Sequence, residues 1–359
     1  MSEVLPLTRA GQWFLHSGIQ EPSGGVARFH RADLHANKPV STEITGYVAS
    51  TLIFLFRATK DEVYLDRARR TAAFLCDHAW DDALGTFPFE HPSPSDSIDH
   101  HAYFFDCGII IRGLLAVWRE TREDRLLDLA NQAAHGMIAD FHSGSDYHPI
   151  LNLPEKQPLT RQQHWSRMPG CYQLKSALAW LEVANITGDG ELSGAYFEML
   201  EDALRAHRDF LPGTPARARV MDRLHAYCYF LEAISPALDR SDCVEAYRYG
   251  LDAASHYLRD IAPEFARSDV YAQLLRARVY GAAVVPVDME AAREEAQALA
   301  AFQTSSEDPR VDGAFLFGRR DGELIPHANP VSTAFAIQAL EVWRAFETGK
   351  EDPCRLPPI

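Results

Sequence analysis

The chain has 359 residues, of which 47% are hydrophobic and 24% charged, and its formal net charge is −15. This composition is that of a globular protein with enough apolar residues for a large core. The negative balance argues against binding to nucleic acids or to anionic membrane surfaces, because both require a basic face. No apolar run approaches the roughly 20 residues of a membrane-spanning helix, so we expect no membrane span.

The six cysteines form no C-x-x-C pair, and most of them lie inside apolar helical stretches. This pattern is typical of small buried side chains in a reducing compartment, and not of a disulfide framework or a zinc site. The N-terminal residues lack the basic segment and the apolar core of a signal peptide. We therefore expect a cytoplasmic protein, with residues 1–359 forming one closed domain.

The spacing of apolar residues predicts helices of two alternating kinds. The first kind is apolar on nearly all sides, which is typical of a buried helix, and the stretch 41–56 is the best example. The second kind is amphipathic, with charged residues between apolar positions at helical spacing, as in 63–78. Buried helices are expected to start near residues 42, 102, 171, 224, 270 and 332, and amphipathic helices at 7–20, 63–78, 123–140, 189–209, 241–259 and 288–302.

The expected buried helices start at intervals of roughly 45–70 residues, which indicates an internal repeat. The sixth buried helix has no amphipathic partner after it, and the helix at 7–20 can supply that partner and close a ring. Strand signals are few and lie in loops rich in glycine and aromatic residues, such as 80–89 and 312–318. The sequence thus predicts an all-α ring of six helix pairs, followed by a loose, proline-rich tail at 353–359.

Polar residues gather where the buried helices begin. Ser41 or Thr42 can cap the helix over 41–56, and Glu43 lies in its first turn, where the helix dipole favours negative charge. A similar start, from Asn329, leads into the last buried helix. In a closed ring these starts would line one mouth of a central cavity.

Six buried helices alternating with six amphipathic ones resemble the (α/α)6 toroid of six-hairpin glycosidases, glycan lyases, sugar epimerases and terpenoid-cyclase-like proteins. The resemblance covers essentially the whole chain as architecture. Two motifs are similar to segments of toroid proteins associated with polysaccharide metabolism. They are Gly-Gly-Val at 24–26 followed by Ser-Thr-Glu-Ile-Thr-Gly-Tyr at 41–47, and Asn-Pro-Val-Ser-Thr-Ala-Phe at 329–335. The resemblance implies glycan handling without naming a reaction, since this fold hosts hydrolases, lyases, isomerases and non-enzymes.

Two carboxylates are the first catalytic candidates. Glu43 can act as a general acid if a partly apolar cavity raises its pKa, although a capping role would explain it equally well. Asp106 lies on an otherwise apolar helix, where a carboxylate must either form an ion pair or have a catalytic role. Pairing of Asp106 with Arg112, with Arg167 or with an arginine of a neighbouring helix is at least as good an explanation as catalysis.

Two further candidates depend on helix starts. Asp222 precedes Arg223 at the predicted start of a buried helix, where an N-cap is its simplest role. His101, in the densest imidazole site, can serve as a general base. The expected substrate-binding residues are Tyr47, His100, Tyr103, Trp165, Arg167, Gln173, Arg223, His225, Tyr227 and Asn329.

The expected partner is an oligosaccharide or a sugar-containing small molecule, because aromatic faces and many polar groups suit a sugar. We expect no cofactor and no metal, since the sequence contains no G-x-G-x-x-G, P-loop or H-E-x-x-H motif.

Three functions remain open at this point. Hydrolysis needs two carboxylates flanking a glycosidic bond, and Glu43 with Asp106 or Asp222 is the candidate pair. Hydrolysis is favoured by analogy, because hydrolases are frequent among proteins with this fold. Epimerisation or β-elimination of a uronic acid would instead use a tyrosine or histidine base and a cation. The residues for that chemistry are Tyr103, His101, His225, Arg223 and Arg167. A non-catalytic glycan-binding or scaffold protein would use the same aromatic mouth without a tuned acid.

Overall fold

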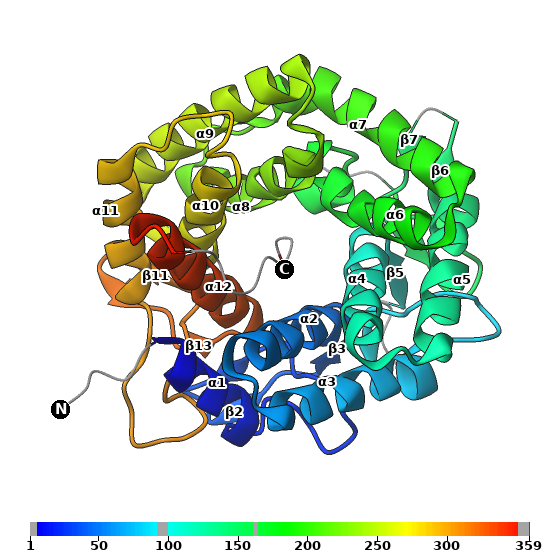
Figure 1. Cartoon of the computed structure of the whole chain (residues 1–359), viewed down its shortest axis with the longest axis horizontal. Helices are drawn as coiled ribbons and strands as arrows, with labels where there is room; N and C mark the ends of the chain where they lie inside the picture. The colour runs from blue at the N-terminus through cyan, green and yellow to red at the C-terminus, as the bar shows by residue number, and fades with distance from the viewer. Residues whose placement is uncertain (1–5, 92–99, 145, 161–163, 351–358) are drawn as a thin grey trace.

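The computed structural model describes residues 6–91, 100–144, 146–160, 164–350 and 359. Within these ranges the helices form two concentric layers around one axis (Figure 1). The inner layer consists of α2 (Thr42–Thr59), α4 (Phe104–Thr121), α6 (Leu174–Thr187), α8 (Arg217–Ile234), α10 (Ser268–Tyr280) and α12 (Pro330–Glu347). The outer layer consists of α1 (Pro6–His16), α3 (Glu62–Phe74), α5 (Asp124–Phe141), α7 (Gly190–Phe210), α9 (Ser241–Ile261) and α11 (Met289–Ala300). This arrangement confirms the predicted (α/α)6 toroid.

The inner layer closes on itself. Each inner helix contacts the next, from α2 through α4, α6, α8 and α10 to α12, and α12 contacts α2. Helix α1 packs against α12 and supplies the outer partner that the sixth pair would otherwise lack. The inner helices are buried on nearly all sides, whereas α1 buries a stripe that includes Trp13 and Phe14. Among the helices that the structure describes, none has both the length and the apolar character needed to cross a bilayer.

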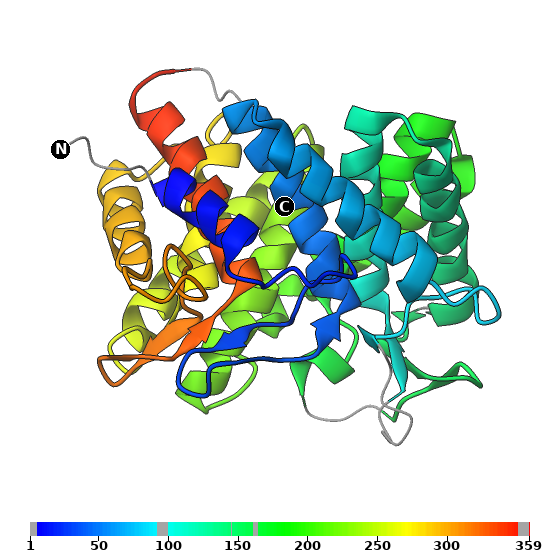
Figure 2. The ribbon, with the colours of Figure 1, turned by 90° about the horizontal axis from the view of Figure 1, so that it is seen from below.

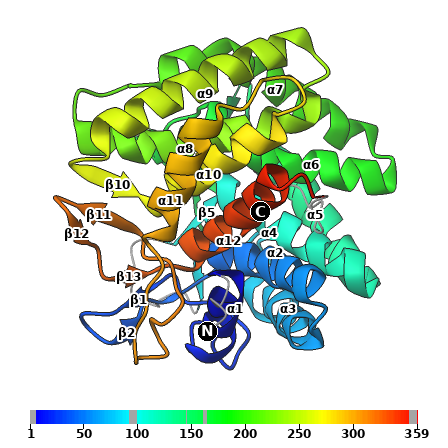
Figure 3. The same cartoon turned by 60° about the vertical axis from the view of Figure 1, so that its left-hand side comes forward.

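Short antiparallel strands gather at the end of the ring where the inner helices begin (Figure 2). β1 (His30–Arg31) pairs with both β2 (Ala36–Asn37) and β13 (His327–Ala328), so segments from the two ends of the chain lie side by side (Figure 3). The other pairings are β3 with β4, β5 with β8, β8 with β9, β6 with β7, β10 with β11, and β11 with β12. The strands are β1 (His30–Arg31), β2 (Ala36–Asn37), β3 (Val40–Ser41), β4 (Glu90–His91), β5 (His101–Tyr103), β6 (His142–Ser143), β7 (Asp146–Tyr147), β8 (Ile150–Asn152), β9 (Gln157–Pro158), β10 (Phe265–Arg267), β11 (Gly318–Arg320), β12 (Glu323–Leu324) and β13 (His327–Ala328). Short 3-10 or π turns cover Leu75–Ala79, Trp165–Arg167, Cys171–Gln173 and Ser235–Ala237.

The predicted cap of the first inner helix is confirmed, and the last inner helix has a cap of the same kind. The side chain of Ser41 accepts a hydrogen bond from the backbone N–H of Ile44 at the start of α2. The side chain of Asn329 does the same for the N–H of Ser332 at the start of α12. These bonds satisfy backbone groups that a helix start leaves open.

The predicted start of the fourth inner helix is wrong. Helix α8 begins at Arg217, so Asp222 lies in its second turn and is not an N-cap. The true start carries no side-chain cap, because Ala216 occupies that position. Without a capping residue the sequence contains no clear start signal there.

Glycines allow α2 and α4 to approach closely near the mouth. A Cβ atom on Gly46 would lie 2.8 Å from the Cα of Ile110, and one on Gly113 would lie 2.5 Å from the backbone oxygen of Gly46. A larger residue at either position would push the two helices apart. Because Gly46 lies one turn after Glu43, this contact brings the first turns of α2 and α4 together.

Charged side chains fill the axis of the ring below the mouth. One carboxylate oxygen of Glu232 on α8 accepts a hydrogen bond from Lys175 on α6, at 2.9 Å, and the other accepts one from Arg276 on α10. All three side chains are completely buried. Burial lowers the pKa of Lys175 to about 7, and the nearby Glu232 acts in the opposite direction. The cluster thus holds three inner helices together across the axis.

Ile359 also helps to fill the axis of the ring beside this cluster. Its backbone N–H donates to Oε1 of Gln338 at 3.0 Å, and its carbonyl oxygen accepts from Nζ of Lys175 at 2.9 Å. Figure 1 places this residue at the centre of the ring. The prediction of a loose tail is therefore wrong for Ile359, because its side chain is buried and its backbone is hydrogen-bonded. Residues 353–358 lie outside the described ranges.

Replacing Glu232 by glutamine should destabilise the ring. The substitution keeps the shape of the side chain but leaves Arg276 buried without its carboxylate, which costs about 3–5 kcal/mol. The midpoint of urea denaturation measures this loss. The control is Glu245→Gln, which removes a pair with Arg208 in which both side chains are more than half exposed, and we expect a change below about 1 kcal/mol. Equal effects of the two substitutions would contradict a structural role for the buried cluster.

Candidate active site

A cavity of about 300 Å³ opens at the mouth where the inner helices begin. This volume is at the small end of the range for ligand sites, and it suits a single sugar unit. Its aromatic lining consists of Phe89, Tyr103, Phe105, Trp165, Tyr172 and Tyr229. Its polar lining consists of Glu43, Asp106, Ser166, Gln173, His225 and Arg267.

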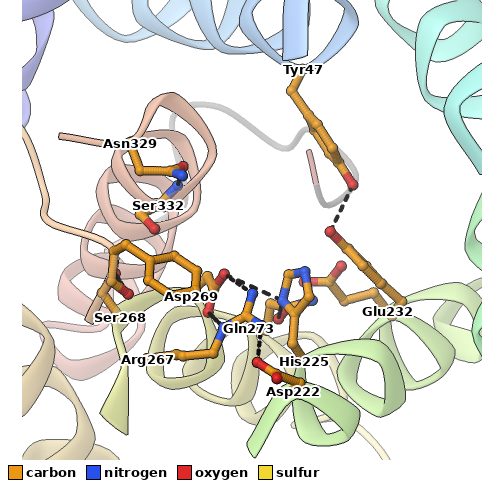
Figure 4. A network of polar contacts seen from close by, with 12 residues as sticks. Tyr47, Asp222, His225, Glu232, Arg267, Ser268, Asp269, Gln273, Asn329 and Ser332 are labelled. Atoms are coloured by element: carbon orange, nitrogen blue, oxygen red, sulfur yellow. Dashed lines mark hydrogen bonds and ion pairs between the residues drawn. The ribbon is translucent and has the colours of Figure 1, made fainter. Parts of the chain in front are cut away.

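Two tyrosines from opposite inner helices meet at the floor of the cavity, and one of them, Tyr229, lines it. The hydroxyl of Tyr47 on α2 donates to the hydroxyl of Tyr229 on α8 at 3.1 Å (Figure 4). The ring of Phe335 packs edge-on against both, with centroid distances of 5.3 and 6.3 Å. The Arg276 guanidinium lies over the ring of Phe335, 4.2 Å from its centroid. The floor and the charge cluster below it therefore close the cavity at its inner end.

Helical spacing places Glu43 and His225 on facing walls directly above this floor. Glu43 precedes Tyr47 by four residues on α2, and His225 precedes Tyr229 by four residues on α8. Residues four apart lie on the same face of a helix, and one turn rises about 5.4 Å. Because the two tyrosines meet on the axis, Glu43 and His225 face the space one turn above them from opposite sides.

Glu43 and Asp106 form a pair of carboxyl groups on the adjoining starts of α2 and α4. Burial raises the pKa of Glu43 to about 7, although Arg28 opposes the shift. Burial and the negative charge of Glu43 raise the pKa of Asp106 well above its ordinary value. Among the described residues, Oδ2 of Asp106 has no hydrogen-bond partner, and Arg112 forms its ion pair with Glu182 of α6 instead. Both shifts favour the protonated carboxyl form near neutral pH, and the two groups influence each other's titration.

His225 is held as a neutral imidazole with one nitrogen able to accept a proton. Its Nδ1 lies 2.8 Å from Oε1 of Gln273 and 3.5 Å from Oδ2 of Asp269. Both oxygens are acceptors, so Nδ1 carries the proton and Nε2 keeps its lone pair. Burial lowers the pKa of His225 to about 4, with Asp269 acting in the opposite direction. At neutral pH this side chain is therefore a base and not a cation.

Arg267 of β10 fixes the carboxylates behind His225. It donates to both oxygens of Asp269, at 3.0 and 2.6 Å, and to Oδ1 of Asp222, at 2.9 Å (Figure 4). Although burial raises the pKa of Asp269, the charge of Arg267 lowers it below its ordinary value overall. Asp222 is thus occupied in an ion pair and does not line the main cavity.

The predicted binding residues divide into two groups. Tyr103, Trp165, Gln173 and His225 line the cavity, whereas Tyr47 is hydrogen-bonded to the lining residue Tyr229 and does not itself line it. The amide of Gln173 is already used by the backbone of neighbouring loops, because it accepts from Gly170 and donates to Tyr147. Arg223 lines a smaller hollow beside the cavity. The residues that do not line the cavity are His100, His101, Arg167, Tyr227 and Asn329.

Local contacts explain why three of the predicted residues do not line the cavity. The hydroxyl of Tyr227 lies 2.9 Å from Nδ1 of His207 on α7, so this side chain is directed towards the outer layer. His101 is buried in β5, which precedes α4, and the predicted helix start near 102 therefore falls at Phe104. Asn329 is used as the cap of α12.

Sequence reasoning missed Tyr229, Phe105, Tyr172 and Arg267. Tyr229 could have been found, because it follows His225 by four residues just as Tyr47 follows Glu43. Arg267 lies in a three-residue strand, and no motif marks it. Within the part of the chain that the structure describes, no group of three or more His, Cys, Asp or Glu side chains is placed to hold a metal ion.

No protein-family model matches this chain, and no curated protein matches it in sequence. Solved structures resemble it in fold. A sugar epimerase from a ruminal bacterium has a TM-score of 0.71 at 12% identity, over 95% of this chain and 99% of that one. Cellobiose 2-epimerase from Spirochaeta thermophila has a TM-score of 0.71 at 13% identity, over 94% and 96% of the two chains. Unsaturated glucuronyl hydrolase from a Bacillus species has a TM-score of 0.63 at 14% identity, over 96% and 97%. At these identities the likeness shows the toroid fold.

Replacing Glu43 by glutamine should stabilise the protein at alkaline pH. The folded protein raises the pKa of Glu43 from 4.5 to about 7, so folding is favoured at low pH, and this contribution is lost as pH rises between those values. Glutamine removes the ionisable group. We therefore expect the denaturation midpoint of Glu43→Gln to exceed that of the wild type at about pH 8, with little difference at about pH 4.5.

The control is Glu62→Gln, which changes an exposed glutamate in the first turn of the outer helix α3. It should not alter the pH dependence of stability. A pH profile of Glu43→Gln parallel to that of the wild type would contradict the raised pKa.

Proposed function

We propose that this protein is a carbohydrate-active enzyme, and that hydrolysis of a glycosidic bond at the end of a saccharide is its reaction. The observation that carries the proposal is the Glu43–Asp106 pair, in which burial raises both pKa values at the mouth of an aromatic cavity. A carboxyl group that stays protonated near neutral pH can act as a general acid. Aromatic rings provide stacking faces for the apolar sides of a sugar.

The carboxyl pair would act as a unit. Its protonated member donates the proton to the glycosidic oxygen as the bond from the anomeric carbon to that oxygen breaks. The ionised member assists the addition of water to the anomeric carbon, either directly as a base or through a covalent intermediate. Because the two groups titrate together, the proton belongs to the pair.

The shape of the cavity supports a preference for chain ends. The Tyr47–Tyr229 contact and the charge cluster close the axis, so a polysaccharide cannot pass through the ring. One terminal unit can enter, with the remainder of the saccharide outside the mouth. The names of two fold neighbours, an epimerase and a glucuronyl hydrolase, are compatible with sugar chemistry in a toroid cavity.

His225 supports a second candidate function, epimerisation of a sugar. This neutral base faces Glu43 across the cavity, and its proton-accepting Nε2 has no hydrogen-bond partner among the described residues. Groups on opposite sides of a sugar carbon can remove a proton from one face and return one to the other. Two of the neighbours named above are sugar epimerases.

Glu43→Gln and Asp106→Asn should each lower the rate of saccharide hydrolysis by about 10²–10⁴-fold. The measurement is product release from a panel of neutral and acidic oligosaccharides, read by mass spectrometry. The wild-type rate should fall as pH rises above about 7 if Glu43 is the acid, because Glu43 then loses its proton. Asp260→Asn is the control, since this carboxylate pairs with Arg217 in a half-exposed ion pair and lines neither hollow, and its effect should be much smaller. Unchanged hydrolysis in Glu43→Gln would refute the role of the pair.

The same panel in heavy water separates hydrolysis from epimerisation. Hydrolysis adds water at the anomeric carbon, whereas epimerisation places deuterium on a sugar carbon, which proton NMR detects. If epimerisation is the reaction, His225→Gln should abolish deuterium incorporation. Binding of a saccharide without either product would favour the non-catalytic alternative.

A further inference from the structure

A second hollow of about 50 Å³ lies beside the main cavity, and Trp165 lines both. Its other walls are His164, the loop before α8, and the first two turns of that helix, which carry Arg219, Asp222 and Arg223. A volume of this size is too small for a sugar ring but accepts a group of a few atoms. The hollow therefore suits a substituent of a molecule whose main part lies elsewhere.

Arg223 is the unusual residue in this hollow. It is only partly exposed, yet it forms no ion pair with any carboxylate among the described residues. Its Nε and one terminal nitrogen donate to the backbone oxygen of Phe210, and its guanidinium lies 4.1 Å from the centroid of the Phe210 ring. The buried arginines elsewhere in the structure each bind a carboxylate. They are Arg112 with Glu182, Arg267 with Asp269, Arg276 with Glu232, and Arg278 with Glu295.

A second cation lies on the same face of α8. Arg219 precedes Arg223 by four residues, so the two side chains are neighbours on the helix surface. Like charges at this spacing destabilise a helix unless an anion lies between them. Asp222 also lines the hollow, but it is a single carboxylate beside two arginines, and Arg267 binds one of its oxygens, so it offsets only part of their charge. The hollow therefore has an excess of positive charge within a protein whose net charge is −15.

The local backbone keeps the hollow open. A Cβ atom at position 213 would lie 2.3 Å from the Arg223 guanidinium, so Gly213 leaves the space that this side chain occupies. The φ angle of Gly213 is +61°, which also favours glycine. The loop conformation at Gly213 thus leaves the space in which the Arg223 guanidinium lies.

We propose that this hollow binds an anionic substituent, a carboxylate or a sulfate, on the unit attached to the sugar in the main cavity. The substrate of the proposed enzyme is accordingly an acidic oligosaccharide. This inference rests on the proposed function for the identity of the main cavity. Guanidinium groups match both oxyanions, because their planar N–H groups can bind two oxygens at once.

The test measures binding of matched disaccharides by isothermal titration calorimetry. The probes are cellobiose, its two monocarboxylates oxidised at C6 of either ring, and its 6-sulfates. We expect one acidic member to bind at least about tenfold more tightly than cellobiose at low salt, with the preference decreasing as salt is added. The carboxylate and sulfate arms identify which anion the hollow prefers.

Arg219→Gln and Arg223→Gln should each reduce that preference by about five- to tenfold and leave the affinity for cellobiose unchanged. Arg219 is exposed, so this variant should fold even if Arg223→Gln does not. The matched control is Arg217→Gln on the same helix, which removes one positive charge but pairs outside the hollow with Asp260 and Glu264. It should retain the preference.

Equal binding of acidic and neutral probes, absence of binding by all probes, or a preference that survives in Arg219→Gln would each overturn the proposal. Failure of the proposed function is distinguishable. The same titrations with Glu43→Gln, which lacks the catalytic pair, should still show the preference for the acidic probe whatever the outcome of the turnover assay.

Discussion

A ring of six helices leaves a hole along its axis, and the need to fill that hole is the constraint on which this structure depends. The chain fills it in two layers. Near the far end, Glu232 binds two buried cations from neighbouring helices. Nearer the mouth, Tyr47 and Tyr229 meet hydroxyl to hydroxyl. Both oxygens of Glu232 and both tyrosine hydroxyls have hydrogen-bond partners, which offsets the cost of burying these groups.

The candidate site follows from this filling. The tyrosine contact sets the separation of α2 and α8, and the residues one turn above it, Glu43 and His225, face each other across the remaining space. Glycines between α2 and α4 set a second separation, which brings Asp106 close enough to Glu43 for their charges to interact. The two carboxyl groups and the imidazole thus owe their positions to packing in which none of the three takes part.

Much of the fold could be predicted from the sequence, because helical periodicity and the alternation of buried and amphipathic helices are local properties. The starts at Ser41 and Asn329 carry capping residues and were predicted, whereas the start at Arg217 carries none and was missed. Glu43 and Asp106 could be singled out because a carboxylate on an apolar helix is conspicuous. Tyr227 and Tyr229 could not be ranked without the helix register, which directs one towards His207 and the other into the cavity. Arg267 depends on strand pairing that two or three residues do not encode.

The closure of the ring has a consequence for how the chain acquires its structure. Helix α1 packs on α12, β1 pairs with β13, and the indole of Trp13 donates to the backbone oxygen of Arg310, which lies 297 positions further along the chain. Contacts between such distant segments form late, because a long loop must close first. During synthesis, the faces of α1 and α2 that pack against α12 therefore stay exposed until α12 has been made. The seam between the first and last helix pairs is where a growing chain exposes apolar surface longest, and hence where misassembly between copies would begin.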